Sequence, residues 1–276
     1  MVGFNDYLNE INKTIRTSIL KVQFLRADET PLFEVVNDVS NSGTLNIQNK
    51  NGVRRSTSFD LTNFKKEYFP ELDSPIWIGK KFKLWLGYRI NGEDYFLPQG
   101  VFVMDDPTVN SNSFTVGVSG IDKFAMLDGT LGGEIDSIFI INAGVSLTTA
   151  INSVMLLSND PKPVVIDTAL GTSTLPYQII KETGDTIGSI LIELAEAFSC
   201  NIYYNEDGFL VFEKDSSDST KGVIHVFSDG EFETNYSNGN IQHNFSEVYN
   251  SCLVIGDNIN GAIATGKVSN LSLIHI

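Results

Sequence analysis

The residues best suited to acid–base or nucleophilic chemistry are few in this chain of 276 residues. Its three histidines are His225, His243 and His275, and the first two lie in segments with strand-like alternation. Proton transfer and nucleophilic attack usually need a histidine or a closely spaced pair of carboxylates. No His-Glu-x-x-His, Cys-x-x-Cys or Gly-x-Ser-x-Gly pattern occurs, so metalloprotease, zinc-site and hydrolase classes lack support. We therefore expect no enzyme active site and no cofactor.

The acidic residues do not form a recognisable metal site either. The run Asn205–Gly208 superficially resembles a calcium loop, but the further spaced acids and closing glutamate of an EF-hand are missing. Its Asp-Gly pair is typical of a hairpin turn. Four other acids fit turns or loops in the same way: Asp105, Asp106, Asp215 and Asp218.

The two cysteines and the glycine-rich segment also have structural interpretations. Cys200 and Cys252 are too few for a disulfide scaffold, and we expect both to behave as small buried apolar residues. The segment 120–133 lacks the Gly-Lys-Ser/Thr ending of a phosphate-binding loop. We interpret it as a hinge between two halves of the chain, with one helical turn at Phe124 and Leu127.

Charge is distributed unevenly along the chain. Residues 1–90 hold 13 Lys or Arg and 10 Asp or Glu, whereas residues 91–276 hold 6 and 24, for a total of −15. Such an acidic chain is expected to repel nucleic acid rather than bind it. The acidity then serves either solubility or a surface past which DNA slides. No apolar run reaches the roughly 18 residues of a membrane span, and the N-terminus does not have the pattern of a secretion signal.

The element expected to position the basic residues is a long hairpin. Two extended runs, Lys80–Ile90 and Tyr95–Met104, flank Asn91-Gly92, the dipeptide that best tolerates positive φ in a tight turn. Because strand side chains alternate, the first run has a core face and a face toward solvent. The core face carries Phe82, Leu84, Leu86 and Tyr88 or Ile90, and the other face carries Lys81, Lys83, Trp85, Gly87 and Arg89.

Five basic residues are the candidate contacts with partner subunits. Lys81, Lys83 and Arg89 share the outer face of the hairpin. We expect the substitution of Lys81 and Lys83 by Glu to weaken assembly without unfolding the domain. Arg54 and Arg55 lie near a second hairpin signal, Asn51-Gly52. Since neighbouring strand residues point to opposite faces, one arginine is free for solvent and the other for a partner or an ion pair.

Around this hairpin the first half of the chain is rich in strands. Phe4, Leu8, Ile11 and Ile15 fall at helical spacing and predict an amphipathic helix of about four turns. Further strands are expected at Ile19–Phe24, Leu32–Val36, Gly43–Gln48, Arg54–Leu61 and Ser113–Gly120.

The second half changes character. Helices are expected at Ser146–Leu157 and after Gly184, where Asp185 fits an N-cap or first-turn position. The second helix leads into a hairpin, Asn201–Tyr204 and Phe209–Glu213. Short strands are expected at Pro163–Ile166, Ile224–Phe227, Glu231–Tyr236, Ile241–Phe245 and Tyr249–Ile255.

An ordered series of short segments resembles the tail-hub proteins of tailed bacteriophages. The family includes baseplate hubs and the N-terminal hub modules of tail-associated lysins. The resemblance spans roughly residues 15–270. Its segments are Arg54-Arg55, Trp77–Lys81, Gly87, Pro98–Phe102, Asp122–Phe124, Leu127–Gly129, Leu191–Glu213 and Tyr249–Gly256.

The resemblance implies an α+β, mainly β architecture of antiparallel, tail-tube-like β-barrel domains with a smaller helix-plus-hairpin α/β insert. We expect an N-terminal helix at 1–17, a first barrel at 18–130, the insert at 131–222 and the returning strands of a second, truncated barrel at 223–270. In the insert, helices are expected at about 145–157 and 185–199, and the hairpin at about 201–213. The last six residues, 271–276, are interpreted as a translated sequencing adapter, so that the natural protein continues beyond Asn270.

The implied function is that of a structural virion protein: a homotrimeric hub joining the tail tube to the spike or tip. Such hubs contact the tube, the distal tail protein and the tape measure, and DNA passes through their channel without specific binding. The protein would then reside in the phage tail and assemble in the host cytoplasm. Two alternatives remain open: the hub module of a lysin whose hydrolase follows the truncated end, and a secreted carbohydrate-binding β-domain.

Overall fold

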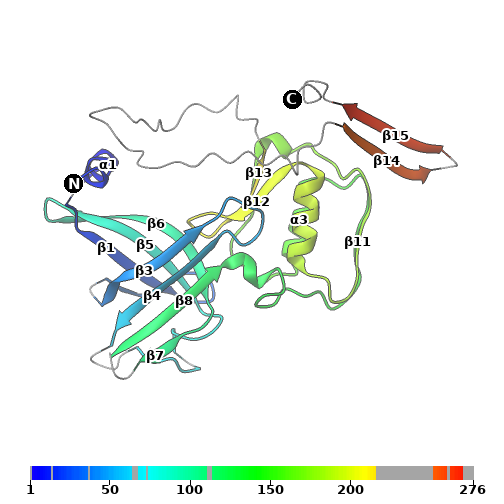
Figure 1. The fold of residues 1–276 in the computed structure, drawn as a ribbon. Coiled ribbons are helices and arrows are strands. Elements are labelled where there is room, and N and C mark those ends of the chain that lie inside the picture. The colour runs from blue at the N-terminus through cyan, green and yellow to red at the C-terminus, as the bar shows by residue number, and fades with distance from the viewer. Residues whose placement is uncertain are drawn as a thin grey trace. The chain divides into compact units, whose positions relative to one another are not determined.

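The computed structural model describes residues 2–13, 15–36, 38–63, 68–72, 74–110, 114–215, 251–259 and 262–269. The chain divides into two compact units, Met1–Ser217 and Asp218–Ile276. The first unit contains an antiparallel sheet, the sheet lobe (residues 18–122), followed by a mixed α/β part, the helical lobe (residues 123–215) (Figure 1).

The sheet lobe is one eight-stranded antiparallel sheet. Its strands run in the order β2-β1-β5-β6-β8-β4-β3, with β7 paired to β8. Strand β3 lies close to β1 although no ladder joins them, so the sheet curls around a single apolar core. The strands are β1 (Ser18–Leu25), β2 (Pro31–Val35), β3 (Val39–Ile47), β4 (Arg55–Thr62), β5 (Lys81–Ile90), β6 (Glu93–Met104), β7 (Thr108–Asn110) and β8 (Thr115–Asp122).

The β5–β6 hairpin has the predicted turn. Asn91 and Gly92 both have positive φ, 53° and 87°, and Ile90 pairs directly with Glu93. This geometry is the two-residue turn whose twist suits antiparallel strands. The predicted core face is confirmed, because Phe82 and Leu84 are buried in the sheet core. Further along the same face, Tyr88 and Ile90 are buried in a second, smaller cluster.

The N-terminal helix α1 (Phe4–Ile11) is shorter than predicted. It has eight residues, and it contacts the hairpin through Tyr7, whose ring lies 5.4 Å from that of Tyr88. Of the predicted apolar stripe, Ile11 packs against this contact, whereas Phe4 and Leu8 are 54% and 43% exposed. The tyrosine supplies a larger aromatic contact than either. The predicted length of about four turns is therefore wrong.

The helical lobe has its own apolar core. Its main helices, α2 (Leu147–Met155) and α3 (Ile187–Ala197), lie inside the expected ranges. Thr186, and not Asp185, caps α3, since its side chain accepts from Ser189 N. The other elements are the 3-10 turns η1 (Lys123–Met126) and η2 (Thr168–Leu170) and the strands β9 (Phe139–Ile141), β10 (Val165–Ile166), β11 (Ile179–Lys181), β12 (Cys200–Tyr204) and β13 (Leu210–Lys214).

Two halves of this lobe repeat each other with an offset of 40 residues. Glu134 bridges to Thr186, and Thr174 bridges to Ser146; the pairs 134/174 and 146/186 each differ by 40. Hydrogen bonds repeat in the same way, from Ile135 N to Asp185 O and from Leu175 N to Val145 O, both 2.8 Å. At the centre, Ile140 of β9 pairs with Ile180 of β11. The lobe is thus a pseudo-two-fold pair of strand–helix modules, which the sequence analysis missed.

The second unit shows an antiparallel pair, β14 (Ser251–Ile259) and β15 (Ala262–Ser269). The predicted strands between residues 224 and 245, all three histidines and residues 271–276 lie outside the described residues. Cys200 is buried and not in a disulfide, as expected. Within the ranges given above, no helix is long and apolar enough to cross a membrane.

Two glycines with the same backbone requirement should respond differently to substitution. Gly92 and Gly133 have φ of 87° and 96°; a Cβ at Gly92 meets nothing within 4 Å, whereas one at Gly133 lies 2.6 Å from the Leu127 backbone. We expect Gly92→Ala to lower the free energy of unfolding by about 1 kcal/mol, from backbone strain alone. Gly133→Ala should cost a further 1–3 kcal/mol or so, since backbone must move.

Urea unfolding followed by circular dichroism measures both losses. Gly92→Asn is the control, because asparagine tolerates positive φ and should keep most of the wild-type stability. Equal losses for the two alanine variants would contradict the packing assigned to Gly133.

Candidate partner contacts and the buried charge cluster

The centre of the first unit is a glutamate held in the tight turn between β1 and β2. Glu29 has a φ of 62°, and Asp28 supports the turn by accepting from Thr30 N at 3.0 Å. The turn directs the Glu29 carboxylate inward, where its side chain is only 1% exposed. A buried carboxylate is costly unless it is paired.

Three lysines supply that pairing. Oε1 of Glu29 lies 2.8 Å from Lys81 Nζ and 2.6 Å from Lys123 Nζ. Oε2 lies 3.2 Å from Lys162 Nζ, as an ion pair without hydrogen-bond alignment. Burial alone would raise the pKa of Glu29, but Lys123 and Lys81 outweigh it and lower the pKa. The carboxylate therefore stays ionised.

Lys123 joins the two lobes. Besides Glu29, its ammonium donates to Asp160 Oδ1 and to Gly208 O, each at 2.9 Å, and lies 4.6 Å from the centre of the Tyr204 ring. Tyr204 in turn donates its hydroxyl to Asp160 Oδ2 at 2.6 Å. Burial lowers the pKa of Lys123, against the raising effect of Asp160 and Glu29. We call Glu29, Lys81, Lys123, Asp160 and Lys162 the charge cluster.

This arrangement suits fixing the lobes better than catalysis. An ammonium has three donors, and three acceptors surround that of Lys123, so no lone pair is free for nucleophilic attack. A cavity of about 240 Å³ borders the cluster and is lined by Lys81, Lys123, Asp160 and Tyr204 among others. No group of three or more His, Cys, Asp or Glu side chains that could hold a metal occurs in the described part of the chain.

Lys81 and Lys83 were predicted to face solvent, and the structure places them otherwise. Lys81 is buried against Glu29, and Lys83 Nζ lies 2.6 Å from Asp207 Oδ1 of the helical lobe. Their face of β5 is covered because residues more than 120 positions away fold onto it. Glutamate in place of Lys81 would face the buried carboxylate of Glu29, so we now expect this change to destabilise the domain as well as any assembly.

The two arginines also contact the helical lobe. Arg55 donates to Tyr204 O at 2.7 Å, and its other terminal nitrogen lies 3.9 Å from Glu206. The Arg54 guanidinium lies over the Tyr203 ring, 3.7 Å from its centre. Asn51 and Gly52 of the same loop exchange hydrogen bonds with the backbone of Ile202. The loop therefore docks on β12.

Arg89 is the exception among the five. It forms a two-pronged ion pair with Asp94 across the hairpin, at 2.7 and 3.0 Å, and half of its side chain is exposed. The structure thus brings Arg54, Arg55, Lys81 and Lys83 to the lobe junction and leaves Arg89 apart. Their contacts with partner subunits stay a prediction.

The acidic partners of these bases were missed by the sequence analysis. Glu29 and Asp160 lie in turn-like segments, where acids are ordinarily solvated. One signal was available at Lys123, a lone lysine in the otherwise apolar run after Asp122. A buried lysine implies a buried acid, but not which one.

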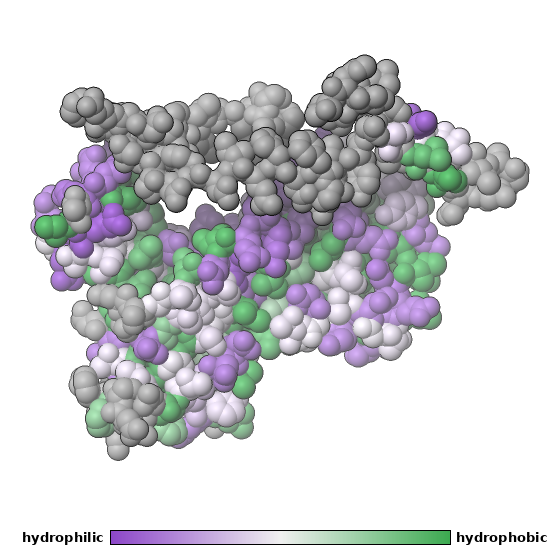
Figure 2. All heavy atoms as spheres, viewed as in Figure 1, coloured by the Kyte–Doolittle hydropathy of each residue, from purple (hydrophilic) through white to green (hydrophobic). Residues whose placement is uncertain are grey.

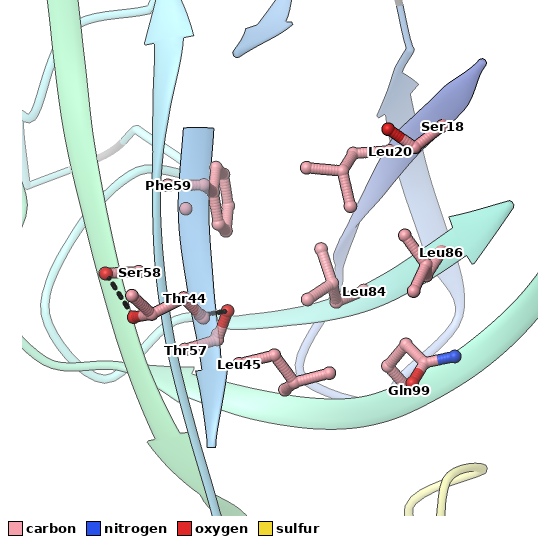
Figure 3. A pocket seen from close by; sticks show the side chains of 11 residues that line it. Ser18, Leu20, Thr44, Leu45, Thr57, Ser58, Phe59, Leu84, Leu86 and Gln99 are labelled. Carbon is pink, nitrogen blue, oxygen red and sulfur yellow. Dashed lines mark hydrogen bonds between the residues drawn. The ribbon is translucent and has the colours of Figure 1, made fainter. Parts of the chain in front are cut away.

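The curled sheet also encloses an apolar cavity near β1 and β3. It has a volume of about 210 Å³ and is shown in Figure 3. Its wall is formed by Leu20, Leu45, Phe59, Leu84 and Leu86. The polar lining consists of uncharged side chains, among them Ser18, Thr57 and Gln99, so the cavity favours an apolar group rather than a reaction.

On the face in Figure 2, the described hydrophobic residues appear in small groups separated by hydrophilic ones.

Removal of the central lysine should destabilise the first unit far more than removal of an exposed cation. Lys123→Met leaves Glu29 and Asp160 buried without their shared partner, and we expect a loss of about 3–5 kcal/mol in the free energy of unfolding. Arg89→Met is the matched control; it breaks a solvent-exposed pair and should change stability little. Urea unfolding of both variants provides the measurement, and similar losses would contradict the central role of Lys123.

Asp122 should make stability depend on pH in an unusual direction. Its carboxyl accepts from Phe124 N at 3.0 Å, and burial raises its pKa from 3.8 to about 6. Between these values the folded chain binds more protons at this site than the unfolded chain, so its contribution to stability falls as pH rises from about 4 to 6. Asp122→Asn should remove this fall.

The measurement is the unfolding free energy of Asp122→Asn relative to wild type at several pH values. The difference should favour the variant increasingly up to about pH 6 and then level off, since the ionised carboxylate is the penalised form. Asp94→Asn should behave oppositely, because the hydrogen bond from Arg89 lowers the pKa of Asp94. A flat profile for the Asp122 variant would contradict the assignment.

Comparison with known proteins identifies the fold. No family model and no curated protein matches this chain. A tail protein from Neisseria meningitidis MC58 superposes with a TM-score of 0.62 and 11% identity, covering 92% of this chain and 68% of that one. Prophage tail protein gp18 from Listeria monocytogenes EGD-e gives 0.46 and 9%, covering 93% and 69%. The 43 kDa tail protein of prophage MuSo2 from Shewanella oneidensis gives 0.45 and 16%, covering 72% and 55%. The chain therefore has the mainly β, antiparallel fold of a tail protein.

Proposed function

We propose that this chain is a structural component of a phage tail, the hub at the tail tip or baseplate. The observation that carries the proposal is the shared fold with the Neisseria meningitidis tail protein over 92% of the chain. Fold alone is an analogy, so the role must also agree with the chemistry of the surface.

The charge distribution supports a role in contact with passing DNA. Residues 131–215 contain 12 Asp or Glu and 3 Lys or Arg. Two of these acids, Glu206 and Asp207, are paired with bases of the sheet lobe, and Asp160 is paired with Lys123. Others, such as Glu134, Asp136 and Glu182, are exposed. An acidic wall repels phosphate and lets a nucleic acid move without binding.

In this proposal the chain forms a homotrimeric ring within the virion, assembled in the host cytoplasm. The ring joins the tail tube to the spike or tip and also contacts the distal tail protein and the tape measure. Residues 18–130 and 223–270 belong to two barrels, with 131–222 as the insert between them. The exposed Arg89 remains a candidate contact with these partners.

The main alternative is the hub module of a tail lysin. It shares the same fold and differs only in a hydrolase encoded further along the reading frame. A carbohydrate-binding β-domain is favoured less, because the closely packed aromatic group of Phe24, Phe82 and Phe102 lies in the sheet core and offers no stacking surface to a sugar.

Deletion of this gene from its phage genome tests the hub role. We expect lysates to contain heads but no complete tails in electron micrographs, because the tube has no platform on which to start. Supplying the full reading frame on a plasmid should restore tails. Normal plaques from the deletion phage would overturn the proposal, and peptidoglycan hydrolysis by the full-length product would favour the lysin.

A further inference from the structure

A second pocket lies where the two lobes of the first unit meet. It has a volume of about 480 Å³, and its wall comes from the turn between β1 and β2, the segment just before β5 and the helical lobe. It shares Lys81 and Met126 with the smaller cavity beside the charge cluster, so the two lie next to each other. Its volume is in the range of pockets that hold small organic molecules.

Every charged side chain among the described residues that line this pocket is basic. These residues are Arg26, Lys80 and Lys81, in a chain whose net charge is −15. Arg26 and Lys80 are exposed, and neither forms an ion pair within the described part of the chain. Asp28, in the same β1–β2 turn, accepts from Thr30 N and Thr30 Oγ1 at 3.0 and 2.7 Å. The pocket therefore carries an excess of positive charge.

Lys81 has hydrogen-bonding capacity that its own chain leaves unused. Its side chain is only 9% exposed, and its ammonium has three donors. Among the described residues one acceptor contacts it, Glu29 Oε1 at 2.8 Å. Glu29 is shared with Lys123 and Lys162, so the charge cluster holds three lysines and two carboxylates. An anion beside Lys81 would supply an acceptor and balance the extra buried charge.

Much of the remaining wall of the pocket is apolar. Leu25 is buried, Met126 is half-buried and Leu32 of β2 is 44% exposed, and all three line the pocket. Phosphate carries charged oxygens on several sides and would meet these groups unfavourably. A carboxylate has its charge at one end and can carry an apolar group at the other. A mainly apolar wall with a few basic groups fits such a ligand.

We propose that this pocket binds a carboxylate attached to an apolar group. The carboxylate accepts from Lys81 Nζ, the exposed Arg26 and Lys80 attract it, and the apolar group packs against Met126 and the leucines. A free organic acid and the C-terminus of a chain that ends in an apolar residue present the same chemistry. The site goes beyond the hub role and does not depend on it, because all its residues belong to one chain.

The test follows the isotope-labelled methionine methyl groups of the full chain by NMR during titration with hexanoate. The chain has four methionines; Met126 lines the pocket, whereas Met155 lies in α2. We expect a saturable shift of the Met126 signal with a Kd on the order of 1 mM, the affinity of a ligand of this size. Met155 should not shift, and Met126→Leu assigns the signal.

Matched probes separate the two parts of the ligand. Hexanamide keeps the carbon chain without the charge, and inorganic phosphate keeps charge without the chain. Each should bind at least about tenfold more weakly than hexanoate. An acetylated peptide that ends in leucine with a free carboxylate tests the second source, with its amide as control. Tighter binding than hexanoate assigns the ligand to a chain terminus, and absence of peptide binding assigns it to a free acid.

Variants identify the cations. Lys81→Met should weaken hexanoate binding at least about tenfold, since it removes a buried charged donor. Because it also disturbs the charge cluster, Arg26→Met and Lys80→Met provide a second measurement at exposed positions that should leave the fold intact. Each should weaken binding about threefold. Lys50→Met is the matched control, because it removes an exposed charge outside the pocket and should leave the Kd unchanged.

Equal affinity for hexanoate and hexanamide would overturn the proposal, and so would phosphate that binds as tightly as hexanoate. A Met126 signal that does not move, or a Met155 signal that moves equally, would also overturn it. Unchanged affinity in all three variants at the pocket would reject its basic side chains as the site. The hub role is tested separately by the deletion phage, whose phenotype does not bear on hexanoate binding.

Discussion

The structure of the first unit depends on one buried carboxylate and the lysines around it. Glu29 and Lys81 come from the sheet lobe, whereas Lys123, Asp160 and Lys162 come from the helical lobe. Gly208 of the helical lobe also approaches Val101 of the sheet lobe so closely that a Cβ at Gly208 would lie 2.7 Å from Val101 Cγ2. The buried ion pairs are directional, and they are best regarded as fixing an orientation rather than adding stability.

How well the sequence alone predicts a feature depends on how far apart in the chain the interacting residues lie. The turn at Asn91-Gly92 depends on neighbouring residues and was predicted correctly, as were the helices that begin after Ser146 and Thr186. The capping residue of the second helix was missed by one position, Thr186 instead of Asp185. The exposure of Lys81 depends on Glu29, 52 residues earlier, and on a lobe folded back onto β5. Periodicity gives the face of a strand but not what covers it. The same limit applies to α1, where Tyr7, and not Phe4 or Leu8, packs against the β5–β6 hairpin.

The candidate site was predicted even less completely. Arg54, Arg55, Lys81 and Lys83 were selected for their charge and were expected to meet other proteins, and the structure gives each an acid, a carbonyl or a ring within the same chain. A basic side chain on a strand has the same sequence signature whether its partner is internal or external. The 40-residue repeat was missed for a related reason: most of its matches are between residues of similar role, such as Leu147 and Ile187, and few are identical, as Ile140 and Ile180 are.

The repeat has a consequence for how the chain is made. Each half of the helical lobe receives its bridge and edge hydrogen bonds from the other, Glu134 from Thr186 and Ser146 from Thr174. The first half of the lobe leaves the ribosome before its partner strand, so it cannot complete its fold until about 40 further residues have been synthesised. Contacts of such sequence separation form late, after the entropy of closing the intervening loop has been lost. The lobe should therefore fold in one step after translation of α3, and until then its isoleucine-rich strand is the segment most in need of protection from aggregation.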